Sequence, residues 1–430
     1  MKASKLTQWI MIAMLLGIAV GYLCNVYAPD ARVAKEIASY FNIVTDIFLR
    51  LIKMIIAPLV IATLIAGIAG AGDTSTVGRI GLKALGWFIT ASLASILLGM
   101  LFVNLLQPGH ALNLPLPEVG AATNLKTSAL NLKDFITHVF PKSVFEALAQ
   151  NEILQILVFA LFFGFALASF KGKVGEHLVK PIEDLVQVML RVTDYVMRFA
   201  PVGVFAAVAS AITVQGIGVL GTYGKFIGGF YVGLVVLWAL LIGAGFLFLG
   251  KRVFTLLKLI REPAILAFST ASSEAAYPKT MEQMEKFGVP NKVTGFVLPL
   301  GYSFNLDGSM MYQAFAALFI AQAYNIDMSL TQQLTMMLVL MVTSKGIAGV
   351  PRASIVVVAA TLPMFGLPEA GLLLIMGIDQ FLDMGRTATN VIGNSIATAV
   401  VAKWEGELGE TRGADEEGML EAPLQPTRAA

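Results

Sequence analysis

The stretch Asp379-Gln-Phe-Leu-Asp-Met-Gly-Arg-Thr-Ala-Thr-Asn-Val-Ile-Gly-Asn394 lies in the last strongly apolar segment of the chain. Its polar residues recur at steps of four, three, four and four, which places them on one face of a helix. Charged side chains are costly inside a membrane and normally face a protein interior or a watery cavity. The stretch therefore predicts a membrane helix with a polar stripe that forms a substrate site. The stripe consists of Asp379, Asp383, Arg386, Asn390 and Asn394.

The composition of the whole chain is that of a polytopic membrane protein. Of its 430 residues, 57% are hydrophobic and 13% are charged, and the mean hydropathy is +0.77. A soluble domain has roughly 25% charged residues. The net charge of +2 and the scattered basic residues do not indicate nucleic-acid binding. Cys24 is the only cysteine, which excludes a disulfide framework and a cysteine metal site.

Apolar runs of about 20 residues, the length that crosses a bilayer, predict six spans in the first part of the chain. They lie near residues 8–28, 41–71, 82–107, 151–170, 181–213 and 223–249. Basic residues fall on alternate sides of these spans, which predicts that both termini are cytoplasmic. Residues 108–150 are polar and indicate an extracellular excursion, and the acidic tail 405–430 is expected to be disordered.

The chain after residue 253 does not fit simple spans. Residues 264–278 change from apolar to small and polar, which favours two half-length helices that meet at a Ser-rich tip. The same shape recurs at 330–365, where Thr343 to Pro351 interrupts an apolar run. Each predicted hairpin precedes a helix with polar residues, first at 305–309 and then at the opening stripe. Such a succession indicates an internal repeat around a site near the middle of the membrane.

Four motifs follow one another from the first hairpin to the last helix. They are Ser272-Ser273, Asn305-Leu306-Asp307-Gly308-Ser309, Gly346 to Pro351, and Asp383 to Asn390. In this order they resemble the dicarboxylate/amino acid:cation symporter family, which includes bacterial glutamate transporters, archaeal aspartate transporters and mammalian excitatory amino acid transporters. With weaker matches upstream, the resemblance covers nearly the whole chain as far as about Lys403.

The resemblance implies an all-α polytopic membrane fold with about eight transmembrane helices and two re-entrant helical hairpins. It also implies inverted repeats and an elevator-type movement of a transport domain against a fixed scaffold, in a homotrimer of the plasma (inner) membrane. Residues 1–250 are expected to supply the scaffold and some transport-domain helices. Residues 251–404 are expected to form the transport core, and 405–430 a disordered acidic cytoplasmic tail.

Arg386 is the central residue of the expected substrate site. Its planar, permanently charged fork suits bidentate capture of a carboxylate, and the resemblance implies that it binds the side-chain carboxylate of the substrate. Asp383 is then expected to accept the α-ammonium group, for which the C4-dicarboxylate branch of the family has no need. An ion pair of Arg386 with Asp379 or Asp383 that serves stability alone is the alternative interpretation.

The resemblance implies further substrate contacts on three other elements. Thr387 could instead bond its own helix backbone, and small residues at a hairpin tip could serve close packing. The second tip is expected to close over the substrate as a gate. The remaining candidate substrate residues are Ser272, Ser273, Ser309, Gly349, Val350, Pro351, Thr387 and Asn390.

The sequence leaves the coupling ion open between sodium and a proton. Asn305 and Asp307 retain sodium ligands of the family, and hard cations prefer such oxygens. Asn394 stands where the family has an aspartate, which weakens a sodium site. Glu274 is a candidate proton acceptor, because a carboxyl group desolvated at the hairpin tip would favour its neutral form. The candidate coupling-ion residues are Thr90, Glu274, Asn305, Asp307, Asn390 and Asn394.

The function predicted from the sequence is secondary active import of glutamate or aspartate, with a proton favoured over sodium as the coupling cation. A C4-dicarboxylate (succinate, fumarate or malate) symporter and a sodium-coupled acidic amino acid carrier are the alternatives. We expect no enzyme activity, because no histidine lies in the hairpins or the stripe to build a hydrolytic site. The expected partners are the small anionic substrate, the lipid bilayer and two further copies of the chain, without nucleic acid or a cofactor.

Overall fold

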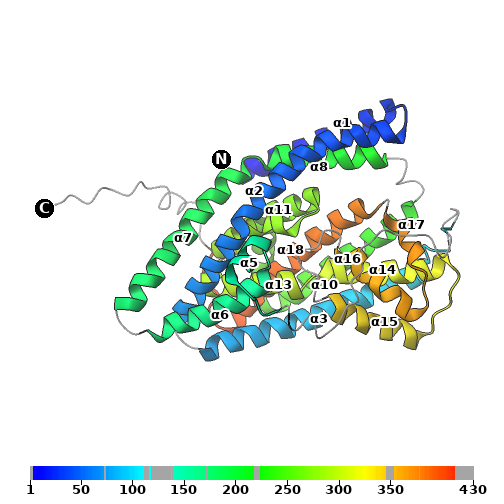
Figure 1. Ribbon diagram of the computed structural model, residues 1–430. Helices are drawn as coiled ribbons and strands as arrows, with labels where there is room; N and C mark the ends of the chain where they lie inside the picture. The colour runs from blue at the N-terminus through cyan, green and yellow to red at the C-terminus, as the bar shows by residue number, and fades with distance from the viewer. Residues whose placement is uncertain are drawn as a thin grey trace.

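The protein is a bundle of helices in the computed structural model (Figure 1). The structure describes residues 3–71, 74–110, 116–117, 137, 139–170, 173–216, 223–344, 353–376 and 378–411. These described residues contain α-helices and short 3-10 turns and no β-strand. The all-helical fold class is therefore confirmed.

The first part of the chain forms eight described helices. Four of them (α1, α2, α3 and α10) are long and apolar enough to cross a membrane. The 17-residue helix α6 is apolar but shorter. The bounds are α1 Ala3–Tyr27, α2 Ala31–Ala71, α3 Thr74–Leu106, α5 Val144–Gln150, α6 Ile153–Ser169, α7 Lys173–Met197, α8 Ala200–Gln215 and α10 Gly224–Leu249.

The predicted span 181–213 is two helices rather than one. α7 ends at Met197, α8 begins at Ala200, and the two axes bend by 51° at this break. Pro201 lies in the first turn of α8, where its missing N–H would have no helical partner anyway. Because proline is tolerated in the first turn of a helix, Pro201 did not by itself show that one helix ends and another begins here. The sequence therefore predicted one continuous span and missed the bend.

The second part of the chain contains the paired half-helices. Its elements are α11 Arg252–Thr270, α12 Ser273–Phe287, α13 Asn291–Phe304, α14 Asp307–Ala323, α15 Leu330–Thr343, α16 Ala353–Thr361, the 3-10 turns Leu362–Phe365 and Glu369–Gly371, α17 Leu372–Met376 and α18 Asp379–Trp404. α11 and α12 pack against each other, as do α15 and α16. The expected tip between α15 and α16, residues 345–352, lies outside the described residues.

Local chemistry explains the turn between α11 and α12. Ala271 has a left-handed backbone (φ 50°), which reverses the chain after the last turn of α11. Ser272 then caps α12, and its side-chain oxygen accepts a hydrogen bond from the Ala275 N–H at 3.2 Å. The Ser-rich stretch therefore ends one helix and starts the next, as the sequence predicted.

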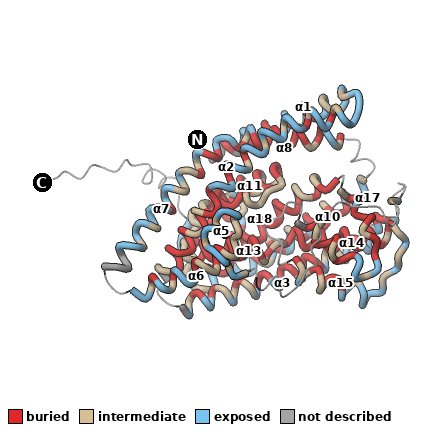
Figure 2. The backbone as a smooth tube through the Cα atoms, in the orientation of Figure 1, coloured by how far each residue is buried: buried red, intermediate tan, exposed pale blue. Residues whose placement is uncertain are grey.

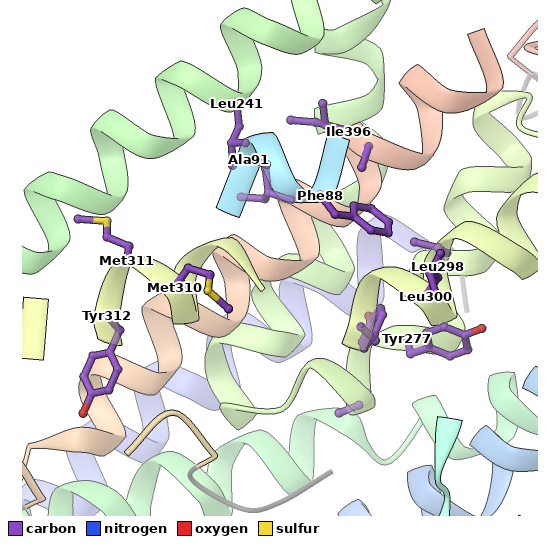
Figure 3. Packing of buried hydrophobic residues seen from close by; sticks show 14 of the residues in the cluster. Phe88, Ala91, Leu241, Tyr277, Leu298, Leu300, Met310, Met311, Tyr312 and Ile396 are labelled. Atoms are coloured by element: carbon purple, nitrogen blue, oxygen red, sulfur yellow. The ribbon is translucent and has the colours of Figure 1, made fainter. Parts of the chain in front are cut away.

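The core lies around α14 and α18, which are buried along nearly their whole length (Figure 2). α3, α10 and α11 pack on these two helices, whereas α1 lies along α8, and α2 along α6, α7 and α8. Figure 3 shows side chains of this core, including Phe88 and Ala91 of α3 with Leu241 of α10 and Ile396 of α18. The outer helix α1 exposes large apolar side chains such as Trp9, Leu15 and Leu23.

The chain after α18 differs from the disordered tail that the sequence predicted. Residues 405–411 are described and pack against the ends of other helices, and Leu408 contacts the core. The Glu405 carboxylate forms ion pairs with Arg79 and Lys83 of α3. An acidic composition did not reveal these partners because they lie more than 300 positions earlier in the chain. Residues 412–430 lie outside the described residues.

Candidate functional site

The polar stripe lies on a single helix, α18, which begins at Asp379 and continues to Trp404. Asp379 is 1% exposed, Arg386 2%, Asn390 4% and Asn394 1%. The Asp383 side chain is different, with 20% of its surface exposed. The stripe thus faces the interior of the protein, and one carboxylate lies at its accessible edge.

Arg386 is held by two carboxylates from its own helix. Its Nη1 donates to Asp379 Oδ1 at 2.8 Å, its Nη2 to Asp379 Oδ2 at 3.5 Å, and its Nε to Asp383 Oδ1 at 2.9 Å. A guanidinium has five N–H groups, so two remain without a partner in the described part of the chain. The group combines one positive and two negative formal charges.

Tyr312 of α14 completes the surroundings of Arg386, and the sequence interpretation missed it. The guanidinium carbon of Arg386 lies 4.3 Å from the centre of the Tyr312 ring, a cation–π distance. The Tyr312 hydroxyl donates to Asp379 Oδ1 at 3.0 Å. The available signal was its position on the apolar helix directly after the Asn305–Ser309 motif.

Asp383 and Thr387 form the accessible edge of the site. Oδ1 of Asp383 accepts hydrogen bonds from Arg386 Nε and, at 3.0 Å, from the Thr387 hydroxyl. Thr387 therefore bonds a carboxylate rather than its own helix backbone. Both described hydrogen bonds of Asp383 involve the same oxygen, so its second oxygen is available to a cationic group.

Asn390 joins α18 to the start of α14. Its side-chain oxygen accepts from the N–H of Gly308 at 2.9 Å and of Ser309 at 3.4 Å, and its side-chain nitrogen donates to Ser309 Oγ at 3.2 Å. These are N–H groups of the first turn of α14, which have no helical partner of their own. A Cβ atom at Gly308 would clash with the backbone of Arg386, so the glycine allows the two helices to meet here.

Three polar side chains form a second group one turn deeper. Asn305 is fully buried, as is Asp307, and Asn394 is 1% exposed. The Asn305 amide nitrogen donates to Asp307 Oδ2 at 3.1 Å and to Asn394 Oδ1 at 3.2 Å. The Asn305 side-chain oxygen has no hydrogen-bond partner in the described part of the chain. The group is an oxygen-rich cluster with a single carboxylate.

Two of the expected coupling-ion residues lie away from this cluster. Glu274, in the first turn of α12, is 30% exposed and lies 3.8 Å from Lys53 Nζ of α2. Glu274 is therefore partly exposed beside a lysine, and its role in coupling stays a prediction. Thr90 is exposed, and its hydroxyl donates to the Gly86 carbonyl of its own helix.

The helical rotation of α3 explains the position of Thr90. The buried hydroxyl groups of α3 are those of Ser92 and Ser95, both 0% exposed. The neighbouring Phe88 lies against Gly301, close to the Asn394 amide. A residue two positions from the buried face points outward, because each helical position turns by about 100°. To predict that Ser92 is buried and Thr90 exposed would have required knowing which face of α3 packs against the core.

The hairpin residues are only partly described. Ser272 caps α12, and Ser273 is the first residue of that helix. The candidate gate residues Gly349, Val350 and Pro351 lie outside the described residues. The structure brings together eight of the candidate residues in two groups. Five lie around the guanidinium and the start of α14, namely Ser309, Asp383, Arg386, Thr387 and Asn390. The other three form the deeper cluster, namely Asn305, Asp307 and Asn394.

A comparison with models of protein families identifies the family of this chain. A model described as the sodium:dicarboxylate symporter family matches residues 6–404. The chain belongs to the sodium:dicarboxylate symporter family. This is a family of transporters rather than enzymes, and the long apolar helices agree with a membrane protein.

Several members of this family are similar to the chain over nearly its whole length. The proton/sodium-glutamate symport protein of Geobacillus stearothermophilus is 41% identical over 418 residues, 96% of this chain and 97% of the relative. The proton/glutamate-aspartate symporter of Escherichia coli K12 is 40% identical over 410 residues, 93% of each chain. The C4-dicarboxylate transport protein of Citrifermentans bemidjiense is 39% identical over 418 residues, 96% of this chain and 94% of the relative. The relatives named for glutamate or aspartate and the relative named for C4-dicarboxylates are thus similar to this chain to nearly the same degree.

Proposed function

We propose that this family member is a secondary active symporter that imports glutamate or aspartate together with a cation. The observation that carries the proposal is the Arg386 group, with two carboxylates around one guanidinium. Two guanidinium N–H groups remain for a substrate carboxylate. The substrate ammonium would balance the second carboxylate, because an unbalanced charge away from water is costly.

The proposed substrate roles follow from this charge balance. Arg386 binds the side-chain carboxylate of the substrate, and the available oxygen of Asp383 accepts its ammonium group. Thr387, Asn390 and Ser309 line the same region. Ser272 and Ser273 approach from the α11–α12 tip, and Gly349, Val350 and Pro351 close over the substrate from the second tip.

A C4-dicarboxylate is the second candidate substrate, favoured by the names of relatives at 39% identity. Such a molecule has two carboxylates and no ammonium. It would therefore leave Asp383 without a balancing cation and add a second negative charge. For this reason we favour an amino acid, although the N–H donors of Arg386 suit either substrate.

The proposed coupling centre is the cluster of Asn305, Asp307 and Asn394. Asp307 is its single carboxylate and is fully buried, so one monovalent cation would neutralise it. We favour a proton over sodium because Asn394 supplies a neutral amide where a second carboxylate would strengthen a sodium site. We assign the coupling role to Asp307 rather than to Glu274, which has an ion-pair partner in Lys53.

The proposed architecture extends to the membrane and the assembly. α11–α12 and α15–α16 serve as re-entrant hairpins, and residues 251–404 form the transport core together with α3 and α10, which pack on α14 and α18. The mutually packed helices α1, α2, α7 and α8 form the scaffold, in a homotrimer with elevator movement. Both termini are proposed to be cytoplasmic.

Uptake into proteoliposomes tests the proposed substrate. Labelled glutamate, aspartate and succinate are offered in parallel to the wild type and to Arg386→Ala. We expect uptake of both amino acids, inhibition of each by the other, and loss of uptake in the variant. Uptake of succinate alone would contradict the role of Asp383, and retained uptake by Arg386→Ala would contradict the central assignment.

Separately imposed ion gradients test the coupling cation. With a proton gradient alone, the wild type is expected to accumulate substrate, and a sodium gradient alone is expected to have little effect. Asn394→Asp adds a second carboxylate beside Asp307 and is expected to increase the sodium dependence. Sodium-driven uptake by the wild type with no response to protons would contradict the proton proposal.

A further inference from the structure

The seven residues that follow α18 tie the ends of several helices together. We call residues 405–411 the C-terminal strap. The strap begins at Glu405, whose carboxylate is 2% exposed and lies 2.8 Å from Arg79 Nη2 and 2.7 Å from Lys83 Nζ. Lys83 Nζ also donates to the Trp404 carbonyl at 2.8 Å. The end of α18 is thus fixed to the first turns of α3.

The middle of the strap contacts α13 and the core. Glu407 Oε1 accepts a 2.6 Å hydrogen bond from Lys292 Nζ, which belongs to the second residue of α13. Leu408 packs against the buried core. α13 leads directly to Asn305 and Asp307, so this contact joins the strap to the helix that precedes the proposed coupling centre.

The end of the strap closes the base of the α11–α12 pair. The Gly409 N–H donates to the Gly288 carbonyl at 2.9 Å. Arg252, the first residue of α11, donates from Nη2 to the Gly409 carbonyl at 2.6 Å and to the Phe287 carbonyl at 3.1 Å. Its guanidinium also lies 4.9 Å from the centre of the Phe287 ring. One side chain therefore joins both ends of the helix pair to the strap.

These contacts connect two parts of the proposed substrate site. The α11–α12 pair carries Ser272 and Ser273 at its tip, and α18 carries Arg386 and Asn390. α12 has 15 residues and is about 22 Å long. A tilt of about 5° at its base would displace the tip by about 2 Å, which is enough to break a hydrogen bond to a bound substrate.

We propose that the C-terminal strap is a positioning element, which holds the α11–α12 tip in register with the stripe of α18 and so sets substrate affinity. The effect on affinity rests on the proposed function, whereas the effect on the tip does not. A strap that only stabilises the fold would lower the unfolding temperature of its variants without changing KM or the exposure of the tip.

Paired variants test the strap. Truncation after Trp404 removes it, and truncation after Thr411 retains it and serves as the control. Arg252→Gln removes the donors to Gly409 and Phe287 within the full-length chain, and Lys251→Gln changes an exposed neighbouring charge as its control. If the chain truncated after Trp404 fails to fold, Arg252→Gln still tests the strap within the full-length chain.

Two measurements are made on each variant. The first is the KM and maximal rate of amino acid uptake into proteoliposomes. The second is the rate at which a thiol reagent labels Ser272→Cys in a Cys24→Ala background, which requires no transport. For the first truncation and for Arg252→Gln we expect KM to rise about 3- to 30-fold, with a smaller change in maximal rate, and the labelling rate to change by a similar factor.

The controls are expected to behave as the full-length wild type in both measurements. Unchanged KM and unchanged labelling after loss of the strap would overturn the proposal, as would a lower unfolding temperature alone. If the wild type transports no amino acid, the proposed function fails. The labelling rate still decides whether the strap positions the tip.

Discussion

Arg386 shows how a permanent charge is accommodated in the interior of this protein. Burial removes the guanidinium from water, and the two carboxylates of Asp379 and Asp383 replace that solvation at hydrogen-bond distance. The Tyr312 ring covers one face of the guanidinium. Three of the five guanidinium N–H groups donate to these two carboxylates within the described part of the chain.

Tyr312→Phe tests the contribution of the hydroxyl group to this arrangement. The variant keeps the ring beneath the guanidinium but removes the hydrogen bond to Asp379. A hydrogen bond to a charged group contributes about 1.5 kcal/mol, so KM is expected to rise about tenfold. Tyr277→Phe is the control, because the buried Tyr277 hydroxyl has no hydrogen-bond partner in the described residues. Equal KM values for wild type and Tyr312→Phe would contradict this role.

Gly393→Ala tests the close approach of α18 to the cluster of Asn305, Asp307 and Asn394. A Cβ atom at this position would clash with the Asp307 carboxylate, and overpacking of this kind costs about 1–3 kcal/mol. The variant should therefore unfold at a lower temperature in detergent. Gly243→Ala on α10 is the control, since no atom lies within 4 Å of its added Cβ. An equal unfolding temperature for both variants would argue against the clash.

At the scale of elements, α10 fixes the rotation of α18 from the side opposite the stripe. Trp238 Nε1 donates to Thr389 Oγ1 at 2.7 Å, and the Tyr231 hydroxyl donates to the Phe381 carbonyl at 2.6 Å. The Tyr231 ring also packs against Gly385. Residues 381, 385 and 389 form one face of α18 at steps of four, so α10 holds this face while the stripe turns toward α14.

A double-mutant cycle measures this contact between the two helices. Trp238→Phe and Thr389→Val each remove one partner of the hydrogen bond, and the double variant removes both. The free energies of unfolding are expected to be non-additive by about 0.5–1.5 kcal/mol. Additive losses would mean that the bond contributes nothing by itself. Unfolding by denaturant in detergent provides the measurement.

The break between α13 and α14 is the second element that determines the site. Asn305 and Leu306 leave the helical conformation, so the N–H groups of the next turn need partners from outside their own helix. Asn390 supplies an acceptor to Gly308 and Ser309. A polar residue on one helix thus stabilises an interruption in another, and both groups of the site meet at this crossing.

At the scale of the whole molecule, charges concentrate where the strap gathers the helix ends. Glu405 is the most enclosed of the acids there. Burial by itself would raise the pKa of Glu405, but the hydrogen bonds and charges of Arg79 and Lys83 outweigh it and hold the pKa below its usual value. A lowered pKa in the folded state means that the carboxylate stabilises the fold when it is ionised.

This pKa shift predicts a pH dependence of stability. The contribution of Glu405 is complete above the pKa of an unfolded glutamate, about 4.3, and is lost as the pH falls further through the lowered value. The difference in unfolding temperature between wild type and Glu405→Gln should therefore be constant near neutral pH and shrink below about pH 4. A difference that does not change with pH would contradict the ion pairs as its cause.

Much of the fold follows from the sequence because local patterns are sufficient for it. Apolar runs of membrane length identified the long helices, and the Ser-rich stretch at 264–278 identified the α11–α12 turn through its capping chemistry. The 51° bend between α7 and α8 was missed, since a proline in a first helical turn does not by itself mark a break. The outcome for the second tip stays a prediction.

The sequence by itself determined the helix of the stripe, its single polar face and the conclusion that such charges must face the protein interior. Periodicity and the cost of charge in an apolar environment were sufficient for this. Only the tertiary structure decided that Tyr312 supports Arg386 and that Asn390 caps α14. It also showed that Thr90 is exposed, that Glu274 lies beside Lys53, and that residues 405–411 bind helix ends. The physical reason is that periodicity fixes the face of a helix, whereas the partners on that face come from distant segments brought together by packing.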